Sequence, residues 1–224
     1  GAEWQGWGRL TLREAMAHSS NVYFAQLGVA CGPEAFNAIV ERARINEPMV
    51  YLAAPSAKLE SAKGNVPEVG KKRSLALLAI GQGEVLVTPL HVACFTAAAA
   101  ADGAMMRPRL WSGERPEKLA DLFAPQVAAR LRAMLRDVVT LGTGKAANVP
   151  GLEVCGKTGT AQAPKGDDHA WFTCFAPRPH PNIVVTVLVE NGGFGAAAAL
   201  PVARELLEEA DRLGYVRRAE EGFK

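Results

Sequence analysis

The sequence predicts a protein of the α+β class, in which a helical part is followed by an antiparallel sheet and a last helix. Three observations carry this prediction. Helix start and stop signals dominate residues 1–145, and β-branched or aromatic segments separated by Pro, Gly and Asp turns follow them. An amphipathic segment at 201–213 closes the pattern. A chain of 224 residues suffices for one domain with a sizeable core. We therefore expect a mainly helical lobe at 1–145, and the strands with the terminal helix at 146–224.

The first helices have clear boundaries. Thr11 and Glu14 have the spacing of a capping box, which places a helix start at Thr11. The polar run 18–21 should end that helix, and a second helix should extend to Gly32. Pro33 is suited to begin a third, because its fixed φ and missing N–H fit the first turn of a helix. We expect residues 46–73 to form a long irregular connection.

Further helices and three strands are expected in the rest of the chain. Residues 74–80 form a short apolar segment that runs into Gly-Gln-Gly at 81–83. Thr88 and Pro89 are an N-cap followed by proline, which predicts a helix to about residue 102. Pro125 opens an amphipathic helix that Gly142 should end. The predicted strands lie at 152–162, 170–176 and 183–190.

Composition excludes several classes of function. The net charge of +2 and the absence of long Lys/Arg runs argue against nucleic-acid binding. No stretch approaches the roughly 20 apolar residues of a membrane span. The four cysteines are scattered without ligand spacing, so we expect no metal site and no cofactor. Buried thiols are the default interpretation of these cysteines, and the sequence leaves a disulfide open.

Lys157, Thr158, Gly159 and Thr160 lie inside a predicted strand, where glycine often marks close approach by a ligand. A lysine and two hydroxyls beside such a gap can hold a carboxylate by charge-assisted hydrogen bonds, and the Thr160 N–H can serve an oxyanion hole. The alternative is an edge strand with solvent-facing Lys and Thr. Gly151, Gly156, Lys157 and Thr158 have the spacing of a phosphate-binding P-loop. That motif joins a strand to a helix, whereas Lys157 and Thr158 lie inside a predicted strand, so we do not interpret them as a P-loop.

These residues belong to a wider resemblance. Ser-x-Asn at 19–21 and Lys-Thr-Gly at 157–159 are two of the three motifs of penicillin-binding proteins and serine β-lactamases. The flanking segments resemble the class B transpeptidases in particular. These segments are LREAMAHSSNVYF at 12–24, IGQGEVLVTPLHVA at 80–93, VTLGTG at 139–144, GKTGTAQ at 156–162 and HAWFTCFAP at 169–177.

The resemblance implies a fold, a reaction and a set of roles. The fold would be the helical lobe and antiparallel sheet of the penicillin-binding and serine β-lactamase type. Ser19 would relay protons between the acylating centre and Lys157, and Asn21 would bind the backbone of a stem peptide or a β-lactam amide. Thr158, Gly159 and Thr160 would bind the carboxylate of D-Ala-D-Ala. Ser19 and Asn21 as simple helix caps are the alternative. His169, Trp171 and the Gly-Gln-Gly turn are interpreted as structural.

The third family motif, Ser-x-x-Lys with the nucleophile, is absent from the sequence. No lysine stands three residues after any serine; the serines are Ser19, Ser20, Ser56, Ser61, Ser74 and Ser112. We therefore expect a partial transpeptidase domain, incomplete on its N-terminal side and inactive alone. The strand at 183–190 would then expose an apolar edge. The missing part of the domain, or an oligomer partner, would cover this edge.

The leading hypothesis is part of a peptidoglycan D,D-transpeptidase that acts outside the cytoplasm and is anchored through an N-terminal segment not present here. Its expected ligands are the D-Ala-D-Ala stem peptide and β-lactams, with no nucleic acid. A β-lactamase or penicillin sensor shares the motifs, but the segments between Asn21 and Lys157 favour a transpeptidase. A non-catalytic scaffold that has lost the nucleophile is the alternative from a different class.

Overall fold

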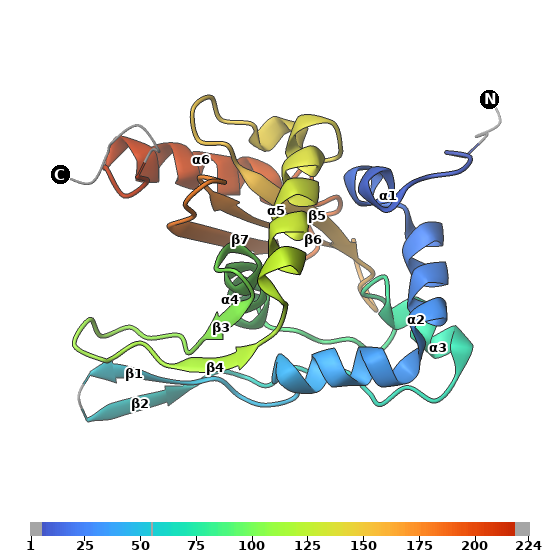
Figure 1. The fold of residues 1–224 in the computed structure, drawn as a ribbon, viewed down its shortest axis with the longest axis horizontal. Coiled ribbons are helices and arrows are strands. Elements are labelled where there is room, and N and C mark those ends of the chain that lie inside the picture. Colours follow the sequence, from blue (N-terminus) through green and yellow to red (C-terminus); the bar gives the residue numbers. More distant parts are fainter. Residues whose placement is uncertain (1–5, 55, 218–224) are drawn as a thin grey trace.

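The computed structural model describes residues 6–54 and 56–217 (Figure 1). Its helices are α1 (Leu12–His18), α2 (Asn21–Arg42), α3 (Lys72–Leu78), α4 (Pro89–Ala100), α5 (Pro125–Thr140), the 3-10 turn η1 (Lys145–Ala147) and α6 (Ala199–Arg212). Its strands are β1 (Val50–Ala54), β2 (Ala57–Glu60), β3 (Ala104–Met106), β4 (Lys118–Asp121), β5 (Cys155–Ala161), β6 (His169–Ala176) and β7 (Ile183–Val189). This arrangement confirms the predicted α+β class.

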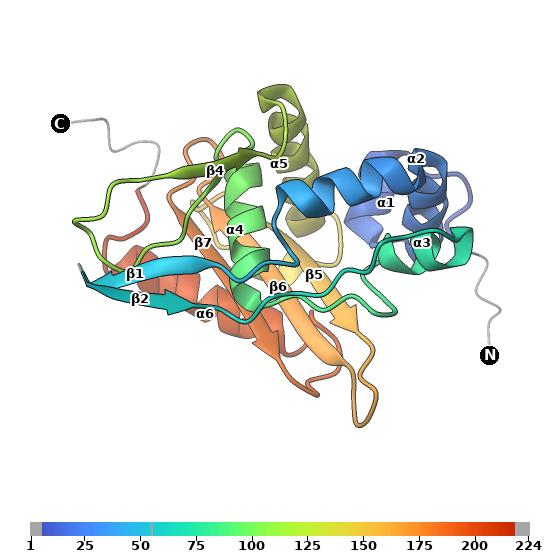
Figure 2. The same cartoon turned by 90° about the horizontal axis from the view of Figure 1, so that it is seen from below.

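The main sheet is antiparallel, in the order β5-β6-β7. Side chains alternate between its faces, so that one row of β6 packs on α6 while the other faces α4. Figure 2 shows α4 and α6 on opposite sides of the strands. Phe172 and Cys174 are buried against α6, whereas the Thr173 hydroxyl lies 2.8 Å from that of Thr96 on α4. The sheet is therefore the middle layer between two helical layers.

Helix α1 is fixed at both of its ends. The Thr11 backbone N–H donates to the Glu14 carboxylate, and the Glu14 N–H donates to the Thr11 hydroxyl, which completes the predicted capping box. The helix ends at Ser19, whose φ of 54° is left-handed. Ala17 is in backbone contact with the end of α5, where the Thr143 N–H donates to its carbonyl at 3.1 Å. A Cβ on Gly142 would lie only 2.0 Å from the same carbonyl oxygen. Glycine is required here because the two backbones meet.

The remaining helix and strand predictions agree with the structure within a few residues. Helix α2 contains the expected break, at Gly32 with φ 83°. Helices α3 to α6 and strands β5 to β7 occupy the predicted segments. The expectation of an irregular connection at 46–73 was wrong, because β1 and β2 form a hairpin there. All four side chains of β2 are exposed, so this strand leaves no hydrophobic alternation for a sequence pattern to detect.

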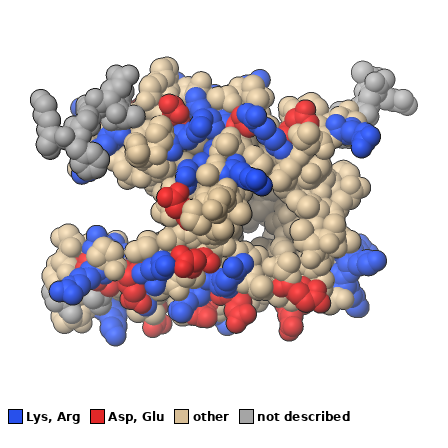
Figure 3. Space-filling model, viewed as in Figure 1, with Lys and Arg blue, Asp and Glu red and all other residues tan. Residues whose placement is uncertain are grey.

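A second hairpin, β3-β4, was also missed. It lies beside β1 in the lower layer of Figure 1, where the Arg107 guanidinium donates to the carbonyl of Val50 and pairs with Glu117. Figure 3 shows acidic and basic side chains interspersed over this face, which is hollowed between its upper and lower parts. Among the described helices, none is both long and apolar enough to cross a bilayer.

Candidate functional site

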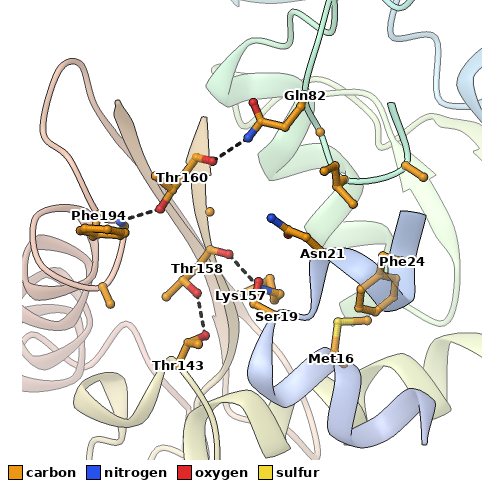
Figure 4. A pocket seen from close by; sticks show the side chains of 16 residues that line it. Met16, Ser19, Asn21, Phe24, Gln82, Thr143, Lys157, Thr158, Thr160 and Phe194 are labelled. Atoms are coloured by element: carbon orange, nitrogen blue, oxygen red, sulfur yellow. Dashed lines mark hydrogen bonds between the residues drawn. The ribbon is translucent and has the colours of Figure 1, made fainter. Parts of the chain in front are cut away.

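A cleft of about 610 Å³ opens between the helical part and strand β5. Figure 4 shows β5 on one wall and the start of α2 on the other. The lining residues are Met16, Ser19, Asn21, Phe24, Ala79, Ile80, Gly81, Gln82, Thr143, Lys157, Thr158, Gly159, Thr160, Phe194, Gly195 and Ala196. All six residues named from the sequence therefore line one cleft, although 135 or more positions separate Ser19 and Asn21 from the others.

The amino group of Lys157 joins the two walls of the cleft. Its Nζ donates to the Ser19 hydroxyl at 2.7 Å and to the Thr158 carbonyl at 2.9 Å. Burial lowers the pKa of Lys157 from 10.5 to about 8, because a charged ammonium loses hydration there. A lysine with this pKa can take up and return a proton near neutral pH. The Ser19 hydroxyl is the group through which it would do so.

Helix geometry explains how Ser19 and Asn21 come to face β5. The left-handed conformation of Ser19 ends α1, and Ser20 caps α2 with its hydroxyl accepting from the Tyr23 N–H. Asn21 is then the first residue of α2, exposed, and Figure 4 shows its amide pointing into the cleft. Of the two residues for which a helix-cap role was the alternative, Ser19 is the C-cap of α1, whereas the N-cap of α2 is Ser20 and not Asn21.

The two threonines of β5 lie on the face opposite Lys157. The Thr158 hydroxyl is 2.7 Å from that of Thr143, and the Thr160 hydroxyl accepts from the Gly195 N–H at 3.4 Å. These contacts gather two hydroxyls from β5, one from the end of α5 and a backbone N–H at one side of the cleft. Such a set of donors is suited to a carboxylate.

Gly195 allows this side of the cleft to form. A Cβ on Gly195 would lie 2.3 Å from the carbonyl oxygen of Gly159 and 2.4 Å from that of Trp171. The loop that carries Phe194 can therefore approach β5 only without a side chain at this position. Sequence reasoning missed Phe194 and Gly195, and the only signal available was the glycine-rich run 192–195.

Gln82 was interpreted as part of a structural turn, yet its side chain lies in the cleft. Its Nε2 donates to the carbonyl of Thr160 at 3.0 Å, and its Oε1 accepts from the Gln162 N–H at 3.3 Å. The turn holds this side chain over β5 because Gly81 and Gly83 adopt φ values of 71° and 82°. The glutamine between two glycines was the sequence signal that pointed to it.

A second cavity, of about 410 Å³, lies behind Lys157 between α4, α5 and the sheet. Its walls are mainly apolar; they comprise Met16, Ala43, Ile45, Val87, His91, Val92, Phe95, Thr96, Ala99, Leu131, Leu135, Gly156, Lys157 and Thr173. Among the described residues, only Met16 and Lys157 line both this cavity and the cleft. The lysine therefore lies between the cleft and the mainly apolar cavity.

Within the described ranges, no three His, Cys, Asp or Glu side chains are grouped so that they could hold a metal ion. The four cysteines are unpaired, and Cys94, Cys155 and Cys174 are buried. Burial raises the pKa of the Cys155 and Cys174 thiols to about 12. Neither is a thiolate near neutral pH, and neither lines the cleft.

Comparison with known proteins places the chain in a family. The family model for the penicillin binding protein transpeptidase domain matches residues 2–208. The peptidoglycan D,D-transpeptidase PbpA of Mycobacterium tuberculosis is 33% identical over 223 residues, which cover 90% of this chain and 44% of PbpA. The peptidoglycan D,D-transpeptidase MrdA of Haemophilus influenzae is 30% identical, with coverages of 91% and 36%.

Solved structures give the same result. Penicillin-binding protein A from M. tuberculosis, as its ceftriaxone acyl-enzyme complex, superposes with a TM-score of 0.81 at 31% identity, over 90% of this chain and 48% of that one. The D,D-transpeptidase domain of a peptidoglycan glycosyltransferase from Eggerthella lenta gives 0.79 at 29% identity, over 94% and 55%. The chain spans less than half the length of the curated relatives described above.

Proposed function

Because the chain belongs to the penicillin-binding protein transpeptidase family, we propose that it is part of a peptidoglycan D,D-transpeptidase. Such an enzyme cross-links stem peptides by acyl transfer through a serine ester. The observation that carries the proposal is the 2.7 Å contact between Lys157 and Ser19, inside a cleft that also holds Asn21 and the two threonines of β5.

Lys157 and Ser19 move protons in the proposed reaction. With a pKa of about 8, the Lys157 amine is partly unprotonated at neutral pH and can accept a proton from the Ser19 hydroxyl. Ser19 in turn takes a proton from the acylating centre and returns it to the leaving D-Ala amine. Asn21, exposed on the opposite wall from β5, donates its side-chain amide to the peptide backbone.

The carboxylate of the terminal D-Ala binds at the hydroxyls of Thr158 and Thr160. This assignment is supported by the group of donors described above, which includes the Thr143 hydroxyl and the Gly195 N–H. The Thr160 carbonyl points away from β6 to Gln82, so the N–H of the same residue also points toward the cleft. That N–H is one donor of the oxyanion hole.

The nucleophile comes from a segment of the same protein outside these 224 residues, since no Ser-x-x-Lys occurs among them. The second cavity supports this part of the proposal. It adjoins Lys157, its lining is mainly apolar, and an apolar helix face packed there would place its polar side at the cleft. The chain's coverage of less than half of its relatives leaves ample length for such a segment.

The whole protein acts outside the cytoplasmic membrane, where peptidoglycan is cross-linked, and is anchored through an N-terminal segment. Strand β7 ends the main sheet within the described part of the chain. We propose that a strand from the rest of the protein pairs with this edge, because its side chains Ile183 to Val189 are apolar except for Thr186.

The test uses the whole protein and a tripeptide that ends in D-Ala-D-Ala, with an acceptor amine. The proposal predicts release of the terminal D-Ala with formation of the cross-linked product. Release of D-Ala without formation of the cross-linked product would indicate a carboxypeptidase. Rapid hydrolysis of penicillin would indicate a β-lactamase. A whole protein that neither turns over the peptide nor reacts with penicillin would contradict the proposal and favour a non-catalytic scaffold.

A further inference from the structure

The side chain of Gln82 forms hydrogen bonds with backbone groups on the outer edge of β5. Its amide bonds to the Thr160 carbonyl and to the Gln162 N–H, at 3.0 Å and 3.3 Å. In an antiparallel pair the ladder hydrogen bonds alternate between the two sides of a strand. The Thr160 carbonyl and the Gln162 N–H therefore point away from β6. An added strand would pair with β5 on that outer side. The Gln82 amide takes the place of one peptide group of such a strand.

An extended peptide on this edge has one direction in which to continue. At the other end of β5, Cys155 and Gly156 are buried, and a Cβ on Gly156 would lie 2.8 Å from the side chains of Phe172 and Cys174. At the far end Gln162 is exposed. A peptide whose carboxylate sits at Thr158 and Thr160 must therefore run outward past Gln162, through the position of the Gln82 amide.

The turn that carries Gln82 has open space beside its two glycines. A Cβ added to Gly81 would meet nothing within 4 Å, and one added to Gly83 would meet only the Leu77 Cβ, at 3.7 Å. The backbone of the turn is held to α3 by the Gln82 N–H, which donates to the Leu77 carbonyl at 3.0 Å. Figure 4 shows the side chain reaching from this turn across the cleft to Thr160.

We propose that Gln82 is a displaceable cap on the substrate-binding edge of β5. In the free protein its amide satisfies the backbone groups of Thr160 and Gln162, and a bound stem peptide takes over the Thr160 carbonyl once Gln82 has turned away. This inference rests on the proposed function, because it assumes that the ligand is an extended peptide. Gln82 is thus a specificity residue: only a ligand with a backbone N–H at this point replaces the hydrogen bond that is lost.

Gln82 competes with the ligand for the Thr160 carbonyl, so the strength of its hydrogen bond can be measured as a change in ligand affinity. Removing the amide without shortening the side chain, as in Gln82→Met, leaves the Thr160 carbonyl open to the peptide. One neutral hydrogen bond corresponds to roughly a three- to tenfold change in affinity. We expect Gln82→Met to bind Nα,Nε-diacetyl-Lys-D-Ala-D-Ala about that much more tightly than the wild-type chain does. The control is Gln126→Met, at an exposed glutamine of α5 that does not line the cleft, which should bind like the wild type.

The direct readout is the side-chain amide signal of Gln82 in a ¹⁵N–¹H spectrum, identified by its loss in Gln82→Met. Saturating tripeptide should move this signal to the position of a solvated glutamine amide. A signal that stays in place at saturation, or a Gln82→Met variant that binds no more tightly, would overturn the cap. Those results would leave the proposed function standing, whereas a tripeptide that binds neither protein would count against both. If Gln82→Met fails to fold, Gln82→Glu, which has the same side-chain length and also lacks the amide N–H groups, identifies the wild-type signal by the same loss.

Discussion

The Lys157 amino group and the Ser19 hydroxyl lie 2.7 Å apart, although 138 positions separate them in the chain. Lys157 lies on strand β5, and Ser19 lies at the left-handed end of α1. The contact places a lysine of lowered pKa beside a hydroxyl at the junction of the sheet and the helical part.

The lowered pKa of Lys157 should appear as a pH dependence of stability. Its pKa is about 8 in the folded chain and 10.5 when unperturbed. Between these values the unfolded state binds more protons, so stability rises with pH. The cost of burying the charge is complete below pH 8 and vanishes above 10.5. Relative to Lys157→Met, the free energy of unfolding should rise by at most about 3 kcal/mol from pH 7 to pH 10, measured by urea titration. A constant difference would contradict the assigned pKa.

Gly142 should be indispensable for the position of α1. A Cβ there would lie 2.0 Å from the Ala17 carbonyl oxygen, so Gly142→Ala must push α1 and Ser19 away from α5. We expect a loss of about 2 kcal/mol or more in the free energy of unfolding. Gly70→Ala is the control, because a Cβ at Gly70 meets nothing within 4 Å; it should change stability by less than about 0.5 kcal/mol. Equal effects of the two substitutions would refute the close contact.

The Thr158 hydroxyl should recognise the carboxylate of the ligand. In the whole protein, Thr158→Val should slow acylation by penicillin roughly 10- to 100-fold, the value of a hydrogen bond to a charged group. A penicillin methyl ester lacks that charge, so wild type and variant should react with it at similar rates. Thr140→Val, at an exposed threonine of α5, is the control and should match the wild type for both compounds. A loss of the same size with the ester would assign Thr158 a structural role instead.

The outer edge of β7 should cause the 224-residue chain to associate. Its side chains are only half buried, and no strand pairs with that edge in the described part of the chain. Light scattering should show a mass that rises with concentration for this chain but not for the whole protein. A monomer at the highest concentration reached would show that the edge needs no cover.

Much of this architecture is predictable from local sequence signals. The capping box at Thr11, the proline at position 89 and the β-branched strand segments each give a boundary within a few residues. The hairpin β1-β2 is not predictable in this way, because β2 is exposed along its whole length and leaves no hydrophobic period.

Some residues of the candidate site are likewise predictable from the sequence, and others are not. Lys157 and Ser19 stand in short motifs, so they can be found from the sequence. Gln82 and Gly195 contact β5 through a backbone group, and Thr143 contacts it through its hydroxyl. These contacts join distant segments, so only the three-dimensional arrangement shows that they meet at β5.

The most direct test of the central claim is the rate and location of penicillin acylation in the whole protein. Mass spectrometry should find one acyl adduct on a serine outside these 224 residues, and none on the 224-residue chain alone. Lys157→Ala should slow acylation roughly a hundredfold or more, whereas Lys165→Ala, at an exposed lysine, should not. An adduct on Ser19 or any other serine of this chain, or a Lys157→Ala protein that reacts like the wild type, would contradict the account.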